Sequence, residues 1–186
     1  VIADRAALYV NPVFSGMHGG FTAFLAVALY TLQIYAEISG AMDIVRGIGY
    51  LFGVHMEKNF EQPFFSKSIA EFWRRWHMTL GRFFTRYVYI PLGGNRKGLP
   101  RQLFNILVVW MLTAFWHGAG WNFFCWGGLL WICIVLERQL GRLKFVHKMK
   151  VLPHIYLWLV IPMSWMCFAI TDLSQLQVYL DKMLWL

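Results

Sequence analysis

His117 is the residue whose surroundings most clearly suggest chemistry. It lies in the sequence FWHGAGW (115–121), and it is the one histidine between Leu103 and Leu136, a stretch without Asp, Glu, Lys or Arg. An ionisable side chain inside so apolar a stretch indicates a functional site within a membrane protein. Because a low-dielectric environment disfavours imidazolium, we expect a neutral ring that can accept a proton. A structural histidine that is hydrogen-bonded to a neighbouring helix is the alternative.

His77 is the second candidate, in the aromatic and basic segment SIAEFWRRWHMTLGRFFTRYVY (68–89). At about 100° per residue on a helix, it falls at the edge of the aromatic face, next to Phe84 and away from the basic residues. It could therefore face the same interior as His117, although a histidine facing lipid headgroups is an equally good interpretation. The remaining histidines have no comparable context: His18, His55, His147 and His154.

The composition indicates a helical membrane protein. The chain is 59% hydrophobic and 14% charged, whereas roughly a quarter of the residues in soluble domains are charged. In lipid, backbone polar groups must pair internally, which leaves helices or closed barrels, and long apolar runs favour helices. We therefore expect an all-α, polytopic membrane protein. The net charge of +8 comes from cations beside apolar runs, a pattern typical of cytoplasmic loops rather than of nucleic-acid binding.

The apolar block 103–136 is expected to fold back on itself next to His117. Basic residues flank both of its ends: Arg96, Lys97 and Arg101 before it, and Arg138, Arg142, Lys144, Lys148 and Lys150 after it. Positive loops tend to stay on the cytoplasmic side, so both ends should lie on one side. The arm up to Trp116 would be roughly 21 Å long as a helix, against a hydrocarbon core of about 30 Å. We therefore predict a re-entrant hairpin that turns at Gly118 and Gly120 deep in the membrane.

An amphipathic helix is predicted from about Ser68 to Tyr87. Ser68 and Glu71 have the spacing of a capping box. On the helical wheel a polar stripe lies opposite the aromatic residues and consists of Glu71, Arg75, Arg82 and Arg86. Such a helix suits the membrane interface, with the stripe toward headgroups or toward a phosphate-rich ligand. A soluble amphipathic helix on a globular core is the alternative.

Two further membrane spans are expected, at 20–40 and at 151–170. Between the first span and the amphipathic helix, Asp43, Arg46 and three glycines interrupt the apolar pattern. We expect this piece to be re-entrant or packed inside protein rather than exposed to lipid. The turn-rich loop 91–101 has glycines whose backbone N–H groups could approach a phosphate, although the loop matches no phosphate-binding pattern.

Three motifs together resemble those of the membrane-bound O-acyltransferase (MBOAT) family. They are W-R-R-W-H (73–77), I-P-L-G-G-N-R (90–96) and W-H-G-A (116–119). The similarity covers nearly the whole chain and is greatest to the alginate O-acetyltransferase (AlgI-like) branch. It implies that residues 1–186 are a partial MBOAT domain, without the family's N-terminal part. It also implies that His117 is the catalytic histidine and that His77 matches a second histidine needed for activity.

The resemblance further implies a function. The expected enzyme is a membrane O-acyltransferase that moves an acetyl or other acyl group from a cytoplasmic activated donor toward an extracytoplasmic polysaccharide or a periplasmic partner protein. The expected donor is acetyl-CoA or another acyl thioester, with no bound cofactor. Membrane lipid is an expected partner and nucleic acid is not. The expected location is the bacterial cytoplasmic (inner) membrane.

Donor or substrate binding is assigned to polar and aromatic residues of the matching motifs and of the polar stripe: Arg75, Trp76, Arg82, Asn95, Arg96 and Trp116. No metal site is expected. The cysteines lie in apolar stretches without metal-ligand spacing, so we expect small core residues at Cys125, Cys133 and Cys167.

Two alternative functions remain open at this point. The branch of the same family that transfers D-alanine to teichoic acid is the first. A membrane transporter that uses His117 as a proton relay is the second, because intramembrane histidines and interrupted helices also suit transport.

Overall fold

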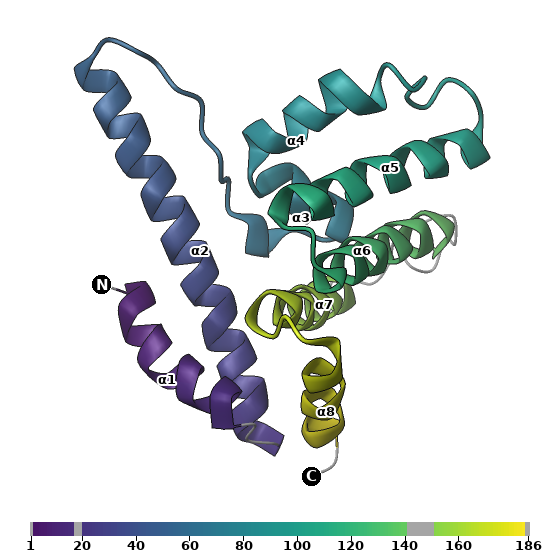
Figure 1. Cartoon of the computed structure of the whole chain (residues 1–186). Helices are drawn as coiled ribbons and strands as arrows, with labels where there is room; N and C mark the ends of the chain where they lie inside the picture. Colours follow the sequence, from purple (N-terminus) through teal and green to yellow (C-terminus); the bar gives the residue numbers. More distant parts are fainter. Residues whose placement is uncertain (1, 17–19, 141–150, 185–186) are drawn as a thin grey trace. The chain divides into compact units, whose positions relative to one another are not determined.

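The computed structural model of the chain describes residues 2–16, 20–140 and 151–184. Every regular element in these ranges is a helix (Figure 1), which confirms the all-α fold class. The chain forms two compact units: residues 1–57 with 161–186, and residues 58–160. Several sequence-based assignments lie outside the described residues: His18, His147 and the basic segment 142–150.

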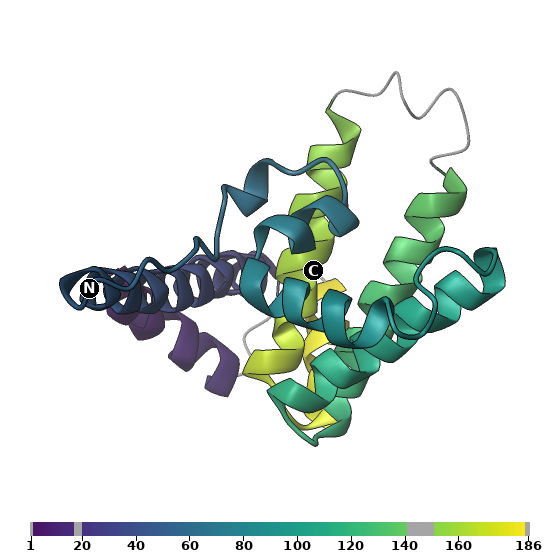
Figure 2. The ribbon, with the colours of Figure 1, turned by 90° about the horizontal axis from the view of Figure 1, so that it is seen from above.

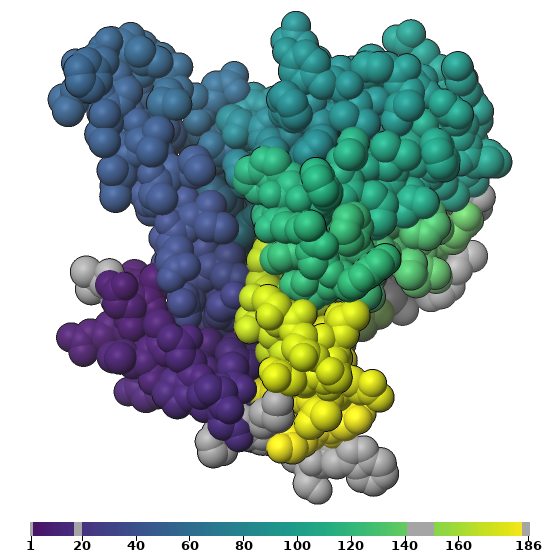
Figure 3. Space-filling view, viewed as in Figure 1, coloured from purple at the N-terminus to yellow at the C-terminus, as the bar shows by residue number. Residues whose placement is uncertain are grey.

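The first unit contains α1 (Ile2–Gly16), α2 (Gly20–Leu51), the last part of α7 (Leu152–Ala169) and α8 (Leu173–Leu184). Its core is an apolar cluster from α2, α7, the residue that follows α7, and α8: Ala23, Val27, Met166, Ile170, Tyr179 and Met183. Phe14 of α1 packs against the rings of Tyr30 and Tyr179, with centroids 5.6 and 5.2 Å away. In the space-filling view of Figure 3, α1 covers the first part of α2, and the second part extends beyond α1.

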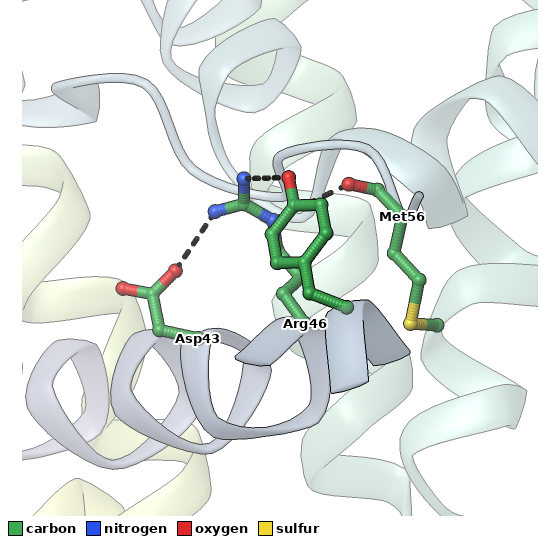
Figure 4. A network of polar contacts seen from close by, with 4 residues as sticks. Asp43, Arg46 and Met56 are labelled. Carbon is green, nitrogen blue, oxygen red and sulfur yellow. Dashed lines mark hydrogen bonds and ion pairs between the residues drawn. The ribbon is translucent and has the colours of Figure 1, made fainter. Parts of the chain in front are cut away.

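The break expected after residue 40 is absent, because α2 is one continuous helix from Gly20 to Leu51. Asp43 and Arg46 pair with each other: Arg46 Nη1 lies 3.1 Å from Asp43 Oδ1, one turn away. Arg46 also donates to the Tyr50 hydroxyl at 3.5 Å and to the Met56 carbonyl oxygen at 3.4 Å (Figure 4). Local pairing therefore lets the helix keep these charges without a re-entrant turn.

The second unit contains the short helices and the central hairpin. In chain order these are η1 (Pro63–Phe65), α3 (Ile69–Arg75), α4 (Met78–Phe84), a π-helical turn η2 (Thr85–Tyr89), α5 (Leu99–His117), α6 (Trp121–Leu140) and the first part of α7. Figures 1 and 2 both show α5 and α6 side by side, joined by a tight turn. Trp131 of α6 donates its indole N–H to the Leu103 carbonyl of α5 at 3.0 Å.

The turn after His117 confirms the predicted hairpin. α5 ends at His117 and α6 begins at Trp121. A Cβ atom on Gly118 would lie 2.5 Å from the Phe123 ring, so a larger residue does not fit the turn. A Cβ on Gly127 would lie 2.9 Å from the Trp110 carbonyl oxygen, which shows how closely the two arms approach. Glycine therefore permits both the turn and the packing.

The length predicted for the hairpin arms was wrong. α5 has 19 residues and α6 has 20, which corresponds to about 28 and 30 Å at 1.5 Å per residue. The helices continue past the apolar block at both outer ends, to Leu99 and Leu140, so each arm can cross a membrane. The depth of the turn stays a prediction.

Four helices of the described residues are long and apolar enough to cross a membrane: Gly20–Leu51, Leu99–His117, Trp121–Leu140 and Leu152–Ala169. The last of these confirms the span predicted at 151–170, which contains Pro162 inside the helix. By length and composition the protein is therefore a multi-pass membrane protein.

The helix predicted from Ser68 to Tyr87 is divided in two. Its start is confirmed, since the Glu71 N–H donates to Ser68 Oγ at 3.0 Å. However, α3 ends at Arg75, and His77 has left-handed backbone angles (φ 47°, ψ 53°) before α4 begins. The polar stripe and the aromatic face are consequently interrupted, and Phe83 and Tyr87 are exposed.

Candidate active site

The two candidate histidines line one cavity of the second unit. Its volume is about 1010 Å³, and α3, α4, η2, α5 and α6 contribute to its walls. His77 comes from the break between α3 and α4, and His117 from the last turn of α5. The two histidines are 40 positions apart in the chain, yet they line the same cavity. The position of His77 on the helical wheel suggested this common location.

Aromatic rings hold the His117 imidazole. It contacts the ring edges of Trp116 and Trp126, with centroids 4.8 and 5.2 Å away, and stacks on Phe123 at 6.4 Å. Trp126 is completely buried, so this side of the imidazole is fixed by the packing of α5 on α6. His117 itself is half-buried and reaches the cavity.

Trp116 connects the two histidines. Its indole is in edge-to-face contact with the His77 ring at 5.9 Å and with the His117 ring at 4.8 Å. Trp116 is still 56% exposed, so its outer surface remains accessible. The fold thus brings together three residues that were assigned from the sequence: His77 and His117 both contact the Trp116 indole.

Asn59 fixes the backbone at His77. Its carbonyl oxygen accepts the Met78 N–H at 2.9 Å, and its side-chain Oδ1 accepts the Thr79 N–H at 3.1 Å and the Thr79 hydroxyl at 2.6 Å. The same Oδ1 lies 3.3 Å from His77 Nδ1. Left-handed angles are unfavourable for a residue other than glycine, so these bonds must stabilise the break.

Burial lowers the pKa of His77 below its ordinary value of 6.5, because desolvation disfavours the charged ring. At neutral pH this imidazole is therefore mainly in its neutral form.

Four arginines line the same cavity: Arg74, Arg82, Arg86 and Arg138. Of the residues assigned to donor or substrate binding, Arg82 and Trp76 belong to the lining. Arg75 instead pairs with Glu71, at 2.7 Å, and it is not among the lining residues.

Asn95 and Arg96 are exposed in the loop between η2 and α5, outside the cavity lining. The buried Asn105 holds this loop, because its Nδ2 donates to the Leu92 and Gly94 carbonyl oxygens at 3.3 and 2.9 Å. The glycine-containing loop thus packs on α5 through backbone carbonyl groups that accept hydrogen bonds from Asn105.

Sequence reasoning missed two positions that shape the cavity, Asn59 and Glu137. The Glu137 carboxylate of α6 accepts the N–H groups of Ile69 and Ala70, the latter at 3.2 Å, and so caps α3. This bond ties α3 to α6, which places Arg74 and Arg138 on one cavity. A signal for Glu137 existed, since it is the first charged residue after the apolar block. Asn59 had none, because it lies in a segment without periodicity.

The cavity combines two imidazoles, cations and aromatic walls. Neutral histidines can exchange protons with a bound hydroxyl, and guanidinium groups bind phosphates or carboxylates. Within the described ranges, no three His, Cys, Asp or Glu side chains are placed to hold a metal ion.

Comparison with known proteins gives a consistent family. Residues 6–176 match the model of the MBOAT, membrane-bound O-acyltransferase family. The chain is 34% identical to the probable alginate O-acetylase AlgI of Pseudomonas putida, over 93% of this chain and 34% of that protein. It is 37% identical to the peptidoglycan O-acetyltransferase of Helicobacter pylori, over 94% of this chain and 34% of that protein.

A more distant relative is the teichoic acid D-alanyltransferase of Bacillus subtilis, at 27% identity over 75% of this chain and 38% of that protein. The chain spans about a third of the length of the curated relatives it matches. Since the family model covers nearly all of the sequence, the chain belongs to the membrane-bound O-acyltransferase family.

Proposed function

We propose that this chain is part of an O-acetyltransferase that moves an acetyl group from an acyl thioester to a hydroxyl group of an extracytoplasmic polysaccharide. The observation that carries the proposal is the shared cavity of His77 and His117. It is supported by relatives named as an alginate O-acetylase and a peptidoglycan O-acetyltransferase. The family favours acyl transfer over the transporter alternative.

In the proposed reaction His117 is the general base. A ring nitrogen takes the proton of the acceptor hydroxyl, and the oxygen attacks the carbonyl carbon of the thioester. The bond between that carbon and sulfur breaks, and the proton on His117 passes to the departing thiolate. The products are an ester and a free thiol, and His117 is again neutral. His77 assists from the break between α3 and α4, which lines the same cavity.

The arginines suggest the donor. Coenzyme A carries several phosphates, and guanidinium groups bind phosphate with charge-assisted hydrogen bonds. Arg82, Arg86 and Arg138 would hold the phosphorylated end while the thioester reaches the histidines. The acceptor would be an extracytoplasmic glycan, directly or through a periplasmic partner protein. The proposed location is the bacterial inner membrane, in line with the four candidate spans.

A D-alanyl transferase is the second candidate, because one relative carries that name. The two functions use the same chemistry and differ in donor and acceptor. Purified protein in liposomes should be given [¹⁴C]acetyl-CoA or a D-alanyl thioester, each with soluble alginate, peptidoglycan fragments or lipoteichoic acid. Label transferred from acetyl-CoA to a glycan supports the proposal. Transfer of D-alanine alone would replace it with the second candidate, and transfer of neither would contradict both.

A further inference from the structure

Three potential hydrogen-bond donors surround a single oxygen atom next to the cavity. Asn59 Oδ1 lies 3.1 Å from the Thr79 backbone nitrogen, 2.6 Å from Thr79 Oγ1 and 3.3 Å from His77 Nδ1. Asn59, His77 and Thr79 are partly buried at this contact. Two acceptor atoms that faced each other here would therefore destabilise the folded protein.

The Thr79 backbone fixes which way the Asn59 amide points. A backbone N–H can only donate, so the amide atom that faces it must be the oxygen and not the NH₂ group. The Thr79 hydroxyl can then donate to the same oxygen. A flipped amide would place two donors against each other at 3.1 Å.

The fixed oxygen in turn constrains the His77 ring. An unprotonated Nδ1 would set a lone pair against the amide oxygen, whereas a protonated Nδ1 donates to it. We propose that Asn59 is a positioning residue, which keeps the hydrogen of His77 on Nδ1 and leaves Nε2 as the nitrogen that accepts a proton. The catalytic role of this tautomer rests on the proposed acyl transfer. The tautomer itself follows from the contacts of His77 and is independent of that proposal.

Two further features restrict the ring. The left-handed backbone at His77 is held by the Met78 N–H, which donates to the Asn59 carbonyl at 2.9 Å. Trp116 also packs its indole edge-to-face against the imidazole, with centroids 5.9 Å apart. Burial also lowers the pKa of His77, so the ring is neutral and has one hydrogen to place. The second histidine of the cavity thus presents an unprotonated Nε2, the nitrogen that can take up a proton when His77 assists His117.

Asn59 also supports the start of α4, so its test must separate orientation from stability. Asn59→Leu removes the acceptor for all three donors. Thr79→Val removes the hydroxyl of the same cap but keeps both the Thr79 N–H and the contact to His77, which makes it the matched control. Asn59→Asp keeps an acceptor oxygen opposite Nδ1 and is the conservative rescue.

The direct measurement is ¹⁵N NMR of the histidine rings in the intact protein, reconstituted in lipid nanodiscs. The His77 signals are assigned by their loss in His77→Gln. We expect a protonated Nδ1 and an unprotonated Nε2 in the wild type and in Thr79→Val, and a protonated Nδ1 in Asn59→Asp. In Asn59→Leu, hydrogen should appear on Nε2. A bare Nδ1 in the wild type, or an unchanged tautomer in Asn59→Leu, would overturn the inference whether or not the protein transfers acyl groups.

The kinetic consequence is measured on the same samples. Asn59→Leu should lower kcat by about tenfold, the size of one orienting hydrogen bond, while the KM for the acyl donor stays within about twofold. Thr79→Val should retain kcat within about twofold. Equal losses in the two variants would assign Asn59 a merely structural role. Acyl transfer absent from the wild type would instead contradict the proposed function and leave the NMR result to decide the tautomer.

Discussion

At the scale of single residues, both histidines are held by contacts from other segments of the chain. His117 stands among aromatic rings, two of which come from the next helix. His77 is held by polar contacts to Asn59, which lies 18 positions earlier in the chain. Ring contacts restrict the plane of an imidazole, and a hydrogen bond such as the one between His77 and Asn59 selects its tautomer. The chemistry of the cavity therefore depends on both kinds of contact.

His77 should make stability depend on pH. Burial lowers its pKa in the folded protein below 6.5, so the unfolded chain binds a proton at higher pH than the folded one. The free energy of unfolding should consequently fall as pH drops through 6.5 toward the folded pKa, and this group should contribute no change above 6.5. The apparent Tm of the wild type should decrease more than that of His77→Gln between about pH 7.5 and pH 5. Parallel pH profiles of the two proteins would contradict the buried neutral ring.

Arg82 and Arg75 provide a matched test of donor binding. Arg82 lines the cavity, whereas Arg75 pairs with Glu71 outside its lining. Arg82→Glu should raise the KM for a coenzyme A thioester at least about tenfold, since a charge-assisted bond is replaced by repulsion. Arg75→Glu should change it less than about threefold. If the two variants bound the donor equally well in a kinetic assay, the cavity arginines would not form the donor site.

At the scale of elements, the sequence correctly predicted features that depend on neighbouring residues, but it did not predict features that depend on tertiary contacts. The cap at Ser68 and the turn after His117 depend on neighbouring residues, so both were predictable. The break at His77 depends on a tertiary contact with Asn59. Hydrophobic periodicity in the sequence does not predict such a contact. The outer ends of α5 and α6 were misplaced because charged and polar residues can extend a helix beyond its apolar part. The continuous α2 was missed for a similar reason, since Asp43 and Arg46 neutralise each other within one turn.

The close packing of the hairpin arms predicts different outcomes for two adjacent glycines. A methyl group on Gly127 would lie 2.9 Å from the Trp110 carbonyl oxygen and 3.1 Å from Ala114 Cβ, whereas one on Gly128 would meet nothing within 4 Å. Gly127→Ala should lower the free energy of unfolding by about 1–3 kcal/mol, as overpacking does. Gly128→Ala should be neutral or slightly stabilising because alanine favours helices. Unfolding in detergent should show this order, and equal stability would contradict the close approach of α5 and α6.

At the scale of the whole molecule, the sequence predicted its class and its family. Long apolar runs and loops rich in cations indicated a helical membrane protein, and four described helices meet the length and composition of a span. The matching motifs indicated the family over nearly the full chain, which the family model confirms. The acceptor of the proposed reaction was not predictable, because nothing in the residues of the cavity distinguishes one hydroxyl group from another.

The two arms of the hairpin predict a topology. Lys97 and Gln139 are exposed at its outer ends, and Ala119 is exposed in its turn. In a variant without native cysteines, single cysteines at 97 and 139 should react with a membrane-impermeant reagent from the same side, the cytoplasm. If both arms span the membrane, a cysteine at 119 should react from the other side only. Labelling of 97 and 139 from opposite sides would contradict the hairpin topology.

The most direct test of the account is acyl transfer by His117→Gln in the intact membrane protein. Glutamine keeps hydrogen bonding but cannot exchange protons, and general acid–base groups contribute about 10²–10⁴-fold to rate. The variant should therefore lose at least about a hundredfold in kcat/KM, with membrane insertion and apparent Tm close to those of the wild type. His55→Gln, which changes an exposed histidine of the other unit, is the control and should retain full activity. Near-normal acyl transfer by His117→Gln would contradict the assignment of His117 as the general base.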